Sequence, residues 1–156
     1  MTKSALYYYF KNRDDIIKVV ASIEINKGKE QLAGVIDSRK AAPDKFAEYV
    51  KTRMFVIESL SSSYNFVAEA YFENYSLVEK LRFEVDREEI ITIRKIIEEG
   101  IEQKIFNPED PDLTALNIFN ILKGIEHAYL VKNESRKMNK EIDNLVILFL
   151  QGLVKR

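Results

Sequence analysis

Cysteine is absent from the sequence, and histidine occurs once, at His127. Without cysteine there is no disulfide framework, no thiolate metal site and no cysteine nucleophile, and a single histidine excludes a histidine-rich metal cluster. Long apolar runs are also missing, because the longest, at positions 145–150, has six residues against the roughly 20 that a membrane-spanning helix needs. Residues 1–13 mix charge with aromatic side chains, unlike a signal peptide. We expect a soluble cytoplasmic protein without metal or cofactor.

A strong net charge is lacking too. The 156 residues include 24 Lys and Arg and 25 Asp and Glu, for a formal charge of −1, which excludes a protein that coats nucleic acid with its whole surface. The charge is nevertheless uneven, because residues 1–13 hold Lys3, Lys11 and Arg13 and no acid. The other residues carry 21 basic and 25 acidic groups. A basic segment at residues 1–13 on an otherwise mildly acidic chain indicates that this segment alone contacts a polyanion.

Turn and strand patterns are scarce. Five glycines, three prolines, no Asn-Gly or Asp-Gly pair and no sustained alternation argue against a sheet. Helix-start patterns are frequent: Asn12 before two acids, Ser76 with Glu79 as a capping box, and Asp110 before Pro111. The sequence predicts an all-α bundle, with helices at about 3–9, 13–36, 44–60, 64–75, 77–104, 111–131 and 140–154.

The last two predicted helices favour a dimer. Helix 140–154 is apolar over roughly 260° of its circumference, where one buried face would need little more than 100°. It therefore packs either in the middle of its own domain or against its own core and a second chain, and we favour the second interpretation. Helix 111–131 carries a stripe of small and polar residues that would allow close helix approach, or would simply face solvent. The predicted interface residues are Asn117, Gly124, Leu145, Leu148, Phe149 and Leu153.

The first residues suggest a reader of duplex DNA. Small and basic residues start a short helix, tyrosines follow, and two more bases come next, in the run Thr2-Lys3-Ser4-Ala5-Leu6-Tyr7-Tyr8-Tyr9-Phe10-Lys11-Asn12-Arg13-Asp14-Asp15-Ile16-Ile17. A helix start of this kind can enter the major groove while tyrosines and bases hold the flanking phosphates. Tyrosine clusters also occur in protein cores, so composition alone does not decide.

This run resembles the recognition helix and following turn of the tetracycline-repressor (TetR) family of transcriptional regulators. The family pattern is approximately Ser/Thr-Lys-Gly/Ser-small-Leu/Ile-Tyr-Tyr/His-Tyr/His-Phe, then Lys-x-Lys/Arg, two acidic or polar residues and an aliphatic one. Glu99-Gly100-Ile101-Glu102, Phe106, Asp110-Pro111 and the stretch 115–124 are similar to the family's regulatory domain entering its dimer helices. Lys104 departs from the pattern, at a place that is often glycine.

The resemblance implies a division into a partial DNA-binding domain at 1–12 and a ligand-binding and dimerisation domain at 13–156. It implies a homodimer, joined through its last two helices, that binds a palindromic operator and leaves it when a small effector binds. The residues that would contact DNA are Thr2, Lys3, Ser4, Tyr7, Tyr8 and Arg13. Family members have two further helices before the recognition helix. We therefore expect this 156-residue chain to bind duplex DNA weakly or not at all, with residues 1–11 mobile, whether through truncation, a misplaced start or loss of DNA binding.

Two charges interrupt the apolar faces of the predicted sensor helices. Arg53 lies in the apolar face of helix 44–60, and Glu126 points the same way as Leu122 on helix 111–131. Such charges either pair with a neighbouring charge or anchor a ligand inside an apolar pocket. The second interpretation predicts an amphipathic or aromatic effector, with an acid for Arg53. The predicted pocket residues are Tyr49, Arg53, Ile57, Phe66, Tyr71, Ile93, Ile97, Phe119, Leu122 and Glu126.

An enzyme is not expected. The sequence shows no nucleophile–base arrangement, phosphate-binding glycine loop or metal-ligand spacing. The neighbouring acids Asp14 and Asp15, like Glu98 and Glu99, do not share a helix face. The alternative to a ligand-responsive regulator is a dimeric small-molecule-binding module without DNA contact.

Overall fold

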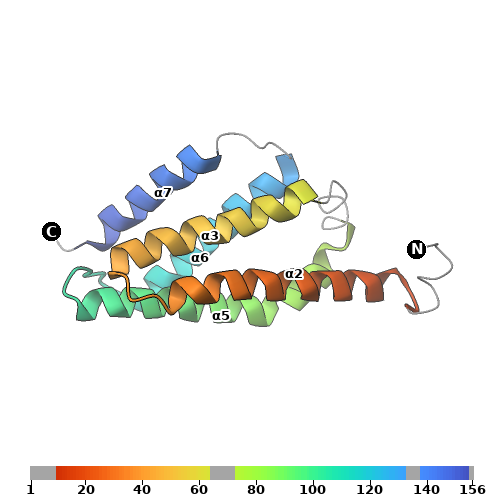
Figure 1. Ribbon diagram of the computed structural model, residues 1–156, viewed down its shortest axis with the longest axis horizontal. Helices are drawn as coiled ribbons and strands as arrows, with labels where there is room; N and C mark the ends of the chain where they lie inside the picture. Colours follow the sequence, from red (N-terminus) through yellow and green to blue (C-terminus); the bar gives the residue numbers. More distant parts are fainter. Residues whose placement is uncertain (1–9, 64–72, 133–137, 155–156) are drawn as a thin grey trace.

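A computed structural model describes residues 10–63, 73–132 and 138–154, and these segments form helices joined by short loops (Figure 1). The predicted helix 3–9 and nearly all of the predicted helix 64–75 lie outside the described residues. The all-α architecture that the sequence predicts is confirmed. The helices are α2 (Arg13–Ile36), α3 (Ala42–Ser63), α5 (Tyr75–Glu102), α6 (Pro111–Lys132) and α7 (Met138–Leu153).

Two of the predicted helix starts are confirmed by their hydrogen bonds. The Asn12 side chain accepts a hydrogen bond from the backbone N–H of Asp15 at 2.9 Å, and α2 begins directly afterwards. Asp110 accepts one from the N–H of Leu113 at 2.9 Å at the start of α6. The predicted capping box at Ser76 is wrong, because α5 begins at Tyr75, after an N-cap residue, Asn74, whose side chain makes no capping hydrogen bond.

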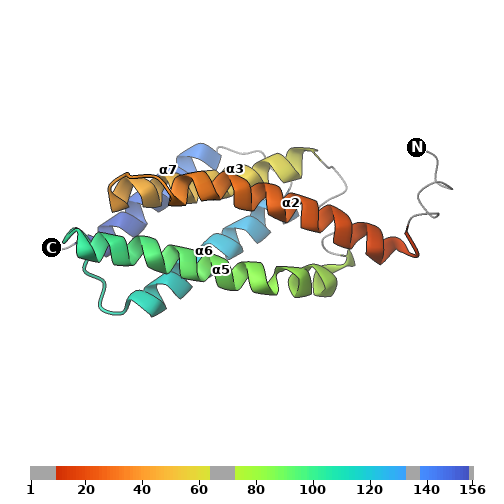
Figure 2. The same cartoon turned by 60° about the horizontal axis from the view of Figure 1, so that its bottom comes forward.

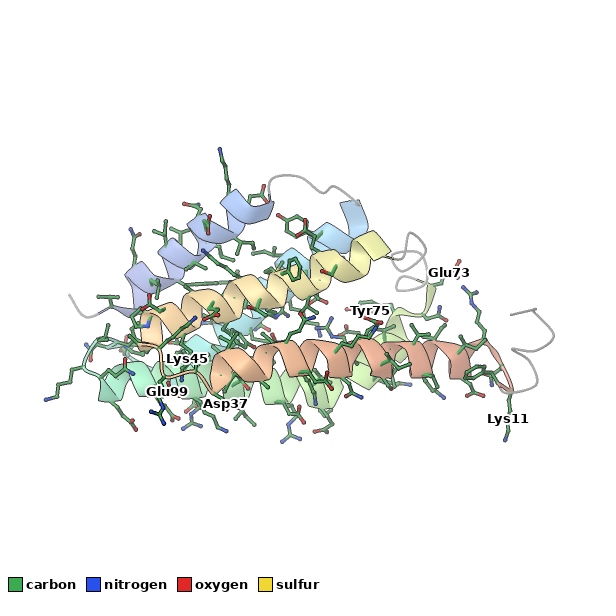
Figure 3. All side chains as sticks on the ribbon, in the orientation of Figure 1. Lys11, Asp37, Lys45, Glu73, Tyr75 and Glu99 are labelled. Atoms are coloured by element: carbon green, nitrogen blue, oxygen red, sulfur yellow. The ribbon has the colours of Figure 1, made fainter. Side chains whose placement is uncertain are left out.

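The long helices α2 and α5 lie side by side and run in the same direction (Figures 1 and 2). Helix α3 runs back along α2 in the opposite direction and also contacts α5 and α6. Helix α7 packs on α3, on the side away from α2 (Figure 1). At the far end of this bundle from Lys11, the buried ammonium of Lys45 binds Glu99 at 2.6 Å (Figure 3).

The hydrophobic core lies where α3, α5, α6 and α7 meet. Phe46 on α3 contacts Phe149 on α7 edge to face, with ring centroids 5.9 Å apart. Aliphatic side chains from the other helices fill the remaining space, since such packing of amphipathic faces supplies most helix stability in proteins. The fully buried members are Ala42, Phe46, Tyr49, Val50, Met54, Ile93, Ile96, Ile97, Ala115 and Leu122.

The end of α5 is a tight left-handed turn that holds the next loop against the core. The N–H of Ile105 donates to the carbonyl of Gly100 at 2.9 Å, and that of Lys104 to Ile101 at 2.9 Å, which is the Schellman pattern. Lys104 has φ = 61°, a conformation that glycine adopts more easily. A Cβ on Gly100 would lie 2.0 Å from the buried ring of Phe106. Lys104, where the sequence departs from the family pattern, thus occupies a backbone position that favours glycine.

No helix in the described part of the chain is both long and apolar enough to pass through a membrane.

Candidate functional site

A cavity of about 440 Å³ opens between α2, α3 and α5. This volume falls within the usual range for sites that bind small molecules. Helix α2 forms one wall along nearly its whole length, from Ile16 to Ile36. Helix α5 forms the facing wall from Val78 to Thr92, and α3 contributes the segment from Tyr49 to Ile57.

The sequence of α2 explains why a wall forms there. Aliphatic residues recur at helical spacing along it, including Val20, Ile25, Leu32 and Ile36, and these side chains line the cavity. Gly28 lies in the same stripe and is buried against α3, where an added Cβ would be 3.2 Å from Val56. The absence of a side chain at Gly28 lets α2 approach α3 closely, while the larger residues before and after it border open space.

Four charged side chains form a buried network beside the cavity. Arg53 donates to both oxygens of Glu89 and, through Nη2, to Glu126 Oε2 at 3.0 Å. Arg82 donates to both oxygens of the same Glu126. Arg53 and Glu126 are almost completely buried, with 4% and 3% of their side-chain surfaces exposed. The network joins α3, α5 and α6, and all four members line the cavity.

The network shifts the pKa values of Arg53 and Glu126 toward their charged forms. Burial alone would lower the pKa of Arg53, but Glu89 and Glu126 outweigh it and raise that pKa. Burial alone would raise the pKa of Glu126, but Arg82 and Arg53 lower it. Burial and the carboxylate of Glu89 raise the pKa of Tyr49, so that its hydroxyl stays protonated and donates to Glu89 at 3.1 Å.

The charges continue along α5 toward α6. Arg82 Nε lies 3.4 Å from Asp86 Oδ1 one turn later. Lys123 on α6 bridges Asp86 and Glu79, binding Glu79 at 2.8 Å. Glu79, Arg82, Asp86 and Glu89 therefore form one charged row on α5, facing α3 and α6. A row of this kind fixes the register of α5 against both helices.

Two exposed ion pairs cross from α2 to α5 and its preceding turn. Lys29 binds Glu88 beside the cavity. Arg13 binds Glu73 at 2.7 Å near the start of both helices, and Figure 3 shows Glu73 at that end of the bundle. Both pairs are well exposed to solvent, so each adds little stability. On this side of the bundle, ion pairs rather than apolar packing connect α2 to α5 and its preceding turn.

The structure brings together four of the ten predicted pocket residues. Tyr49, Arg53, Ile57 and Glu126 line the cavity. The interpretation that the two charges pair with a neighbouring charge is confirmed, because Arg53 binds Glu126; both residues also border the cavity. Arg53 already donates to two carboxylates, so the expected role as anchor for an acid is not favoured. Phe66 and Tyr71 lie outside the described residues, and the remaining four lie in the core rather than among the lining residues: Ile93, Ile97, Phe119 and Leu122.

Sequence reasoning missed the α2 wall and the acidic and basic partners on α5. The α2 wall could have been found from the aliphatic residues that recur at helical spacing along this helix. The partners Arg82 and Glu89 could have been found from their spacing with Glu79 and Asp86, because steps of three and four residues place all of them on one helix face.

The predicted dimer residues divide into exposed and buried groups. Asn117 and Gly124 are exposed on α6, and Leu148 on α7 has 55% of its surface exposed. Leu145 and Phe149 are half-buried, and Leu153 is 2% exposed within its own chain, so Leu153 belongs to the core. Further exposed apolar residues on the same two helices are Leu113, Leu116, Ile121 and Ile147.

Most of the predicted DNA contacts fall on undescribed positions. Thr2, Lys3, Ser4, Tyr7 and Tyr8 lie outside the described residues. Arg13 is described, and it is exposed at the start of α2 with its guanidinium bound to Glu73. Among the residues that the structure describes, no cluster of three or more His, Asp or Glu side chains could hold a metal ion.

The fold of this helical bundle is similar to that of solved bacterial regulators. A Clostridium perfringens protein described as a fatty acid metabolism regulator is 23% identical, with a TM-score of 0.71 over 100% of this chain and 84% of that one. A transcriptional regulator from Cytophaga hutchinsonii is 19% identical, with a TM-score of 0.74 over 99% and 83%. A tetR-family regulatory protein from Rhodococcus is 16% identical, with a TM-score of 0.63 over 100% and 82%.

The chain therefore has a TetR-like fold, and the resemblance noted in the sequence is confirmed at the level of the fold. No protein-family model matches the sequence, and no curated protein does.

Proposed function

We propose that the chain is a ligand-responsive transcriptional regulator that acts as a homodimer and is released from DNA by a small effector. The observation that carries this proposal is the double role of α2. This helix continues directly from the basic and tyrosine-rich run at 2–13, and it also forms one full wall of the cavity. A ligand in the cavity that shifts α2 would therefore also shift the residues that precede this helix in the sequence.

That geometry supports a division of labour between two parts of the chain. Residues 1–12 would belong to the DNA-reading part, and residues 13–156 would hold the effector and the dimer contact. Half-sites one duplex turn apart, about 34–36 Å, tolerate little change in the spacing of two recognition helices. An effector that binds one arrangement of α2 better than the other would shift the population toward the form that does not fit the operator.

The exposed apolar residues support the dimer. Leu113 and Leu116 are three residues apart on α6, Ile121 lies about two turns beyond Leu113, and Ile147 and Leu148 are exposed on α7. Tyr129 on α6 donates to Glu141 on α7, which joins the two helices within a protomer. A second copy that covered these side chains would remove their apolar surface from water, as symmetric dimers do.

The function is tested by cross-linking the native protein to DNA in the cell that produces it and sequencing the DNA that is recovered with it. Enrichment of a palindromic sequence, and its loss when an effector that binds the cavity is supplied, is the expected result. Uniform recovery of DNA, with or without effector, would contradict the proposed function.

A dimeric binding module without DNA contact is the second candidate. The observation that favours it is the pairing of Arg13 with Glu73, which occupies the one described guanidinium that the resemblance assigns to a phosphate. The same capture experiment separates the two candidates, because a module of this kind would recover no specific site.

A further inference from the structure

We propose that the effector is an uncharged molecule made of one long flexible aliphatic chain with a small hydrogen-bonding head. The inference rests on the proposed function in one respect, that the cavity between α2, α3 and α5 holds the effector. It goes beyond that function by assigning the chemical class, and it rests on the shape, the lining and the charge of the cavity.

The cavity is long. Its lining on α5 extends from Val78 to Thr92, a rise of about 21 Å at 1.5 Å per residue. The lining on α2 is longer still, from Ile16 to Ile36. A space of this length can hold an extended aliphatic chain that lies along the two helices.

The walls are aliphatic. Among the described lining residues Tyr49 is the only aromatic one, and the others that are apolar are Ile, Leu, Val, Ala and Gly. Aromatic ligands gain from stacking on aromatic side chains, and the described part of the lining offers no pair of rings for it. A flexible chain needs only dispersion contact and removal of its methylene groups from water.

The two ends of the cavity differ in polarity. Arg13 pairs with Glu73 and Lys29 with Glu88, so α2 and α5 run in parallel from the end that Ile16 and Val78 mark. That end is lined by aliphatic side chains. Because α3 runs the other way (Figure 1), Tyr49 near its start lies toward the opposite end. There the Tyr49 hydroxyl donates to Glu89 at 3.1 Å. The aliphatic chain of the effector would thus lie at the end lined by aliphatic side chains. Its hydrogen-bonding head would lie at the end that holds Tyr49 and Glu89.

The charge at the polar end selects an uncharged head. Arg53 and Arg82 balance Glu89 and Glu126, and each of the four binds at least one group of opposite charge. A carboxylate head would lie against Glu89, a cationic head would lie against Arg53, and neither would find a free partner. The Tyr49 hydroxyl, which donates to Glu89, retains a lone pair that can accept a hydrogen bond from an alcohol or amide head.

The first test is calorimetric titration of the full chain with matched probes. Dodecan-1-ol, dodecanoate, dodecyltrimethylammonium and a tricyclic alcohol of similar carbon number are compared. We expect the linear alcohol to bind best, by about tenfold or more over both charged probes, and affinity to rise about fourfold per methylene from octanol upward. The rise should stop once the chain fills the cavity. Tighter binding of the carboxylate, the ammonium or the tricyclic probe would overturn the assignment.

Variants then locate the two ends. Ala21→Phe narrows the aliphatic end and should shorten the longest chain that binds, whereas Ser22→Phe, which adds the same ring on the exposed side of α2, should change nothing. Tyr49→Phe should weaken alcohol binding about fivefold and leave the corresponding methyl ether unaffected. Glu89→Gln removes a negative charge beside Arg53, so it should raise carboxylate affinity. An unchanged preference in Glu89→Gln, with the thermal midpoint intact, would contradict the charge argument.

These outcomes are separable from those of the proposed function. Binding is measured on the chain without DNA, so a protein that binds linear alcohols yet recovers no operator would retain the effector class and lose the regulator. A protein that recovers an operator and releases it with an aromatic or charged compound would retain the regulator function and lose the proposed effector class.

Discussion

Arg53 and Glu126 are 73 residues apart in the sequence, and their side chains lie 3.0 Å apart in the interior of the bundle. One comes from α3, the other from α6, and each is also bound to a side chain of α5. Buried charges are costly unless they are paired and hydrogen-bonded. The pairing therefore constrains three helices at once, on the boundary between the core and the cavity.

Removing one member of this network should be strongly destabilising. Glu126→Gln would leave two buried guanidinium groups without their shared carboxylate, and we expect a loss of about 3–5 kcal/mol in the free energy of unfolding. Urea titration followed by circular dichroism measures it. The control is Glu84→Gln, which breaks the exposed pair with Arg87 and should change stability by less than about 1 kcal/mol. Equal effects in both variants would contradict the prediction.

The same carboxylate should make stability depend on acidity. The pKa of Glu126 lies below its ordinary value of 4.5 in the folded protein, whereas the unfolded chain releases the proton near that value. Its ionised form therefore stabilises the fold fully above about pH 4.5, and this contribution is lost as the pH falls through the lowered folded-state pKa. We expect the urea midpoint of the wild type to fall more steeply below this pH than that of Glu126→Gln. Parallel curves would contradict the assignment.

Gly100 should tolerate no side chain. Its Cβ would lie 2.0 Å from the Phe106 ring, which is 2% exposed and has little room to move. Gly100→Ala should destabilise by about 1–3 kcal/mol through overpacking. Gly34→Ala is the matched control, because nothing lies within 4 Å of its added Cβ. It should be neutral or stabilising by up to about 1 kcal/mol. Thermal melts of the two variants compare them directly.

Lys104 offers a stabilising substitution. Its φ of 61° costs an L-residue roughly 1 kcal/mol relative to glycine. Lys104→Gly should therefore raise the free energy of unfolding by about 0.5–1 kcal/mol, while Lys104→Ala, which keeps the Cβ, should not. Chemical denaturation of the three proteins measures the difference. An increase in the alanine variant alone would show that charge, not backbone conformation, matters at this turn.

The proposed dimer can be broken at one side chain. Leu148 is 55% exposed on α7, and Leu148→Glu would place a charge in the proposed contact, so we expect a monomer in sedimentation velocity at micromolar concentration. Ile91→Glu changes a similarly exposed aliphatic side chain on α5, which is 50% exposed, and should leave the dimer intact. A wild-type chain that sediments as a monomer would overturn the contact itself.

Helix positions could be predicted from the sequence because their causes are local. Asn12 and Asp110 bind backbone N–H groups within three residues, so their capping role depends on neighbours alone. The start of α5 at Tyr75 could not be predicted in this way, since Asn74 makes no side-chain cap and the helix is positioned by contacts with α2, α3 and α6.

The candidate site was predictable only in part. Arg53 and Glu126 were identified as charges on apolar faces, a feature visible in one helix at a time. Whether Ile93 or Val20 borders empty space depends on how far apart helices stand, which is set by long-range details such as the absence of a side chain at Gly28. Periodicity identifies a buried face, but it does not distinguish the core from a cavity wall.

The bridges from Lys29 to Glu88 and from Arg13 to Glu73 are both exposed to solvent. Dissolved ions screen exposed charges within about 10 Å at moderate ionic strength and affect buried pairs far less. Rising salt should therefore weaken the two exposed ion pairs between α2 and the α5 side of the cavity, while the buried charged network stays fixed. Entry and escape of an occupant of the cavity would then quicken in concentrated electrolyte.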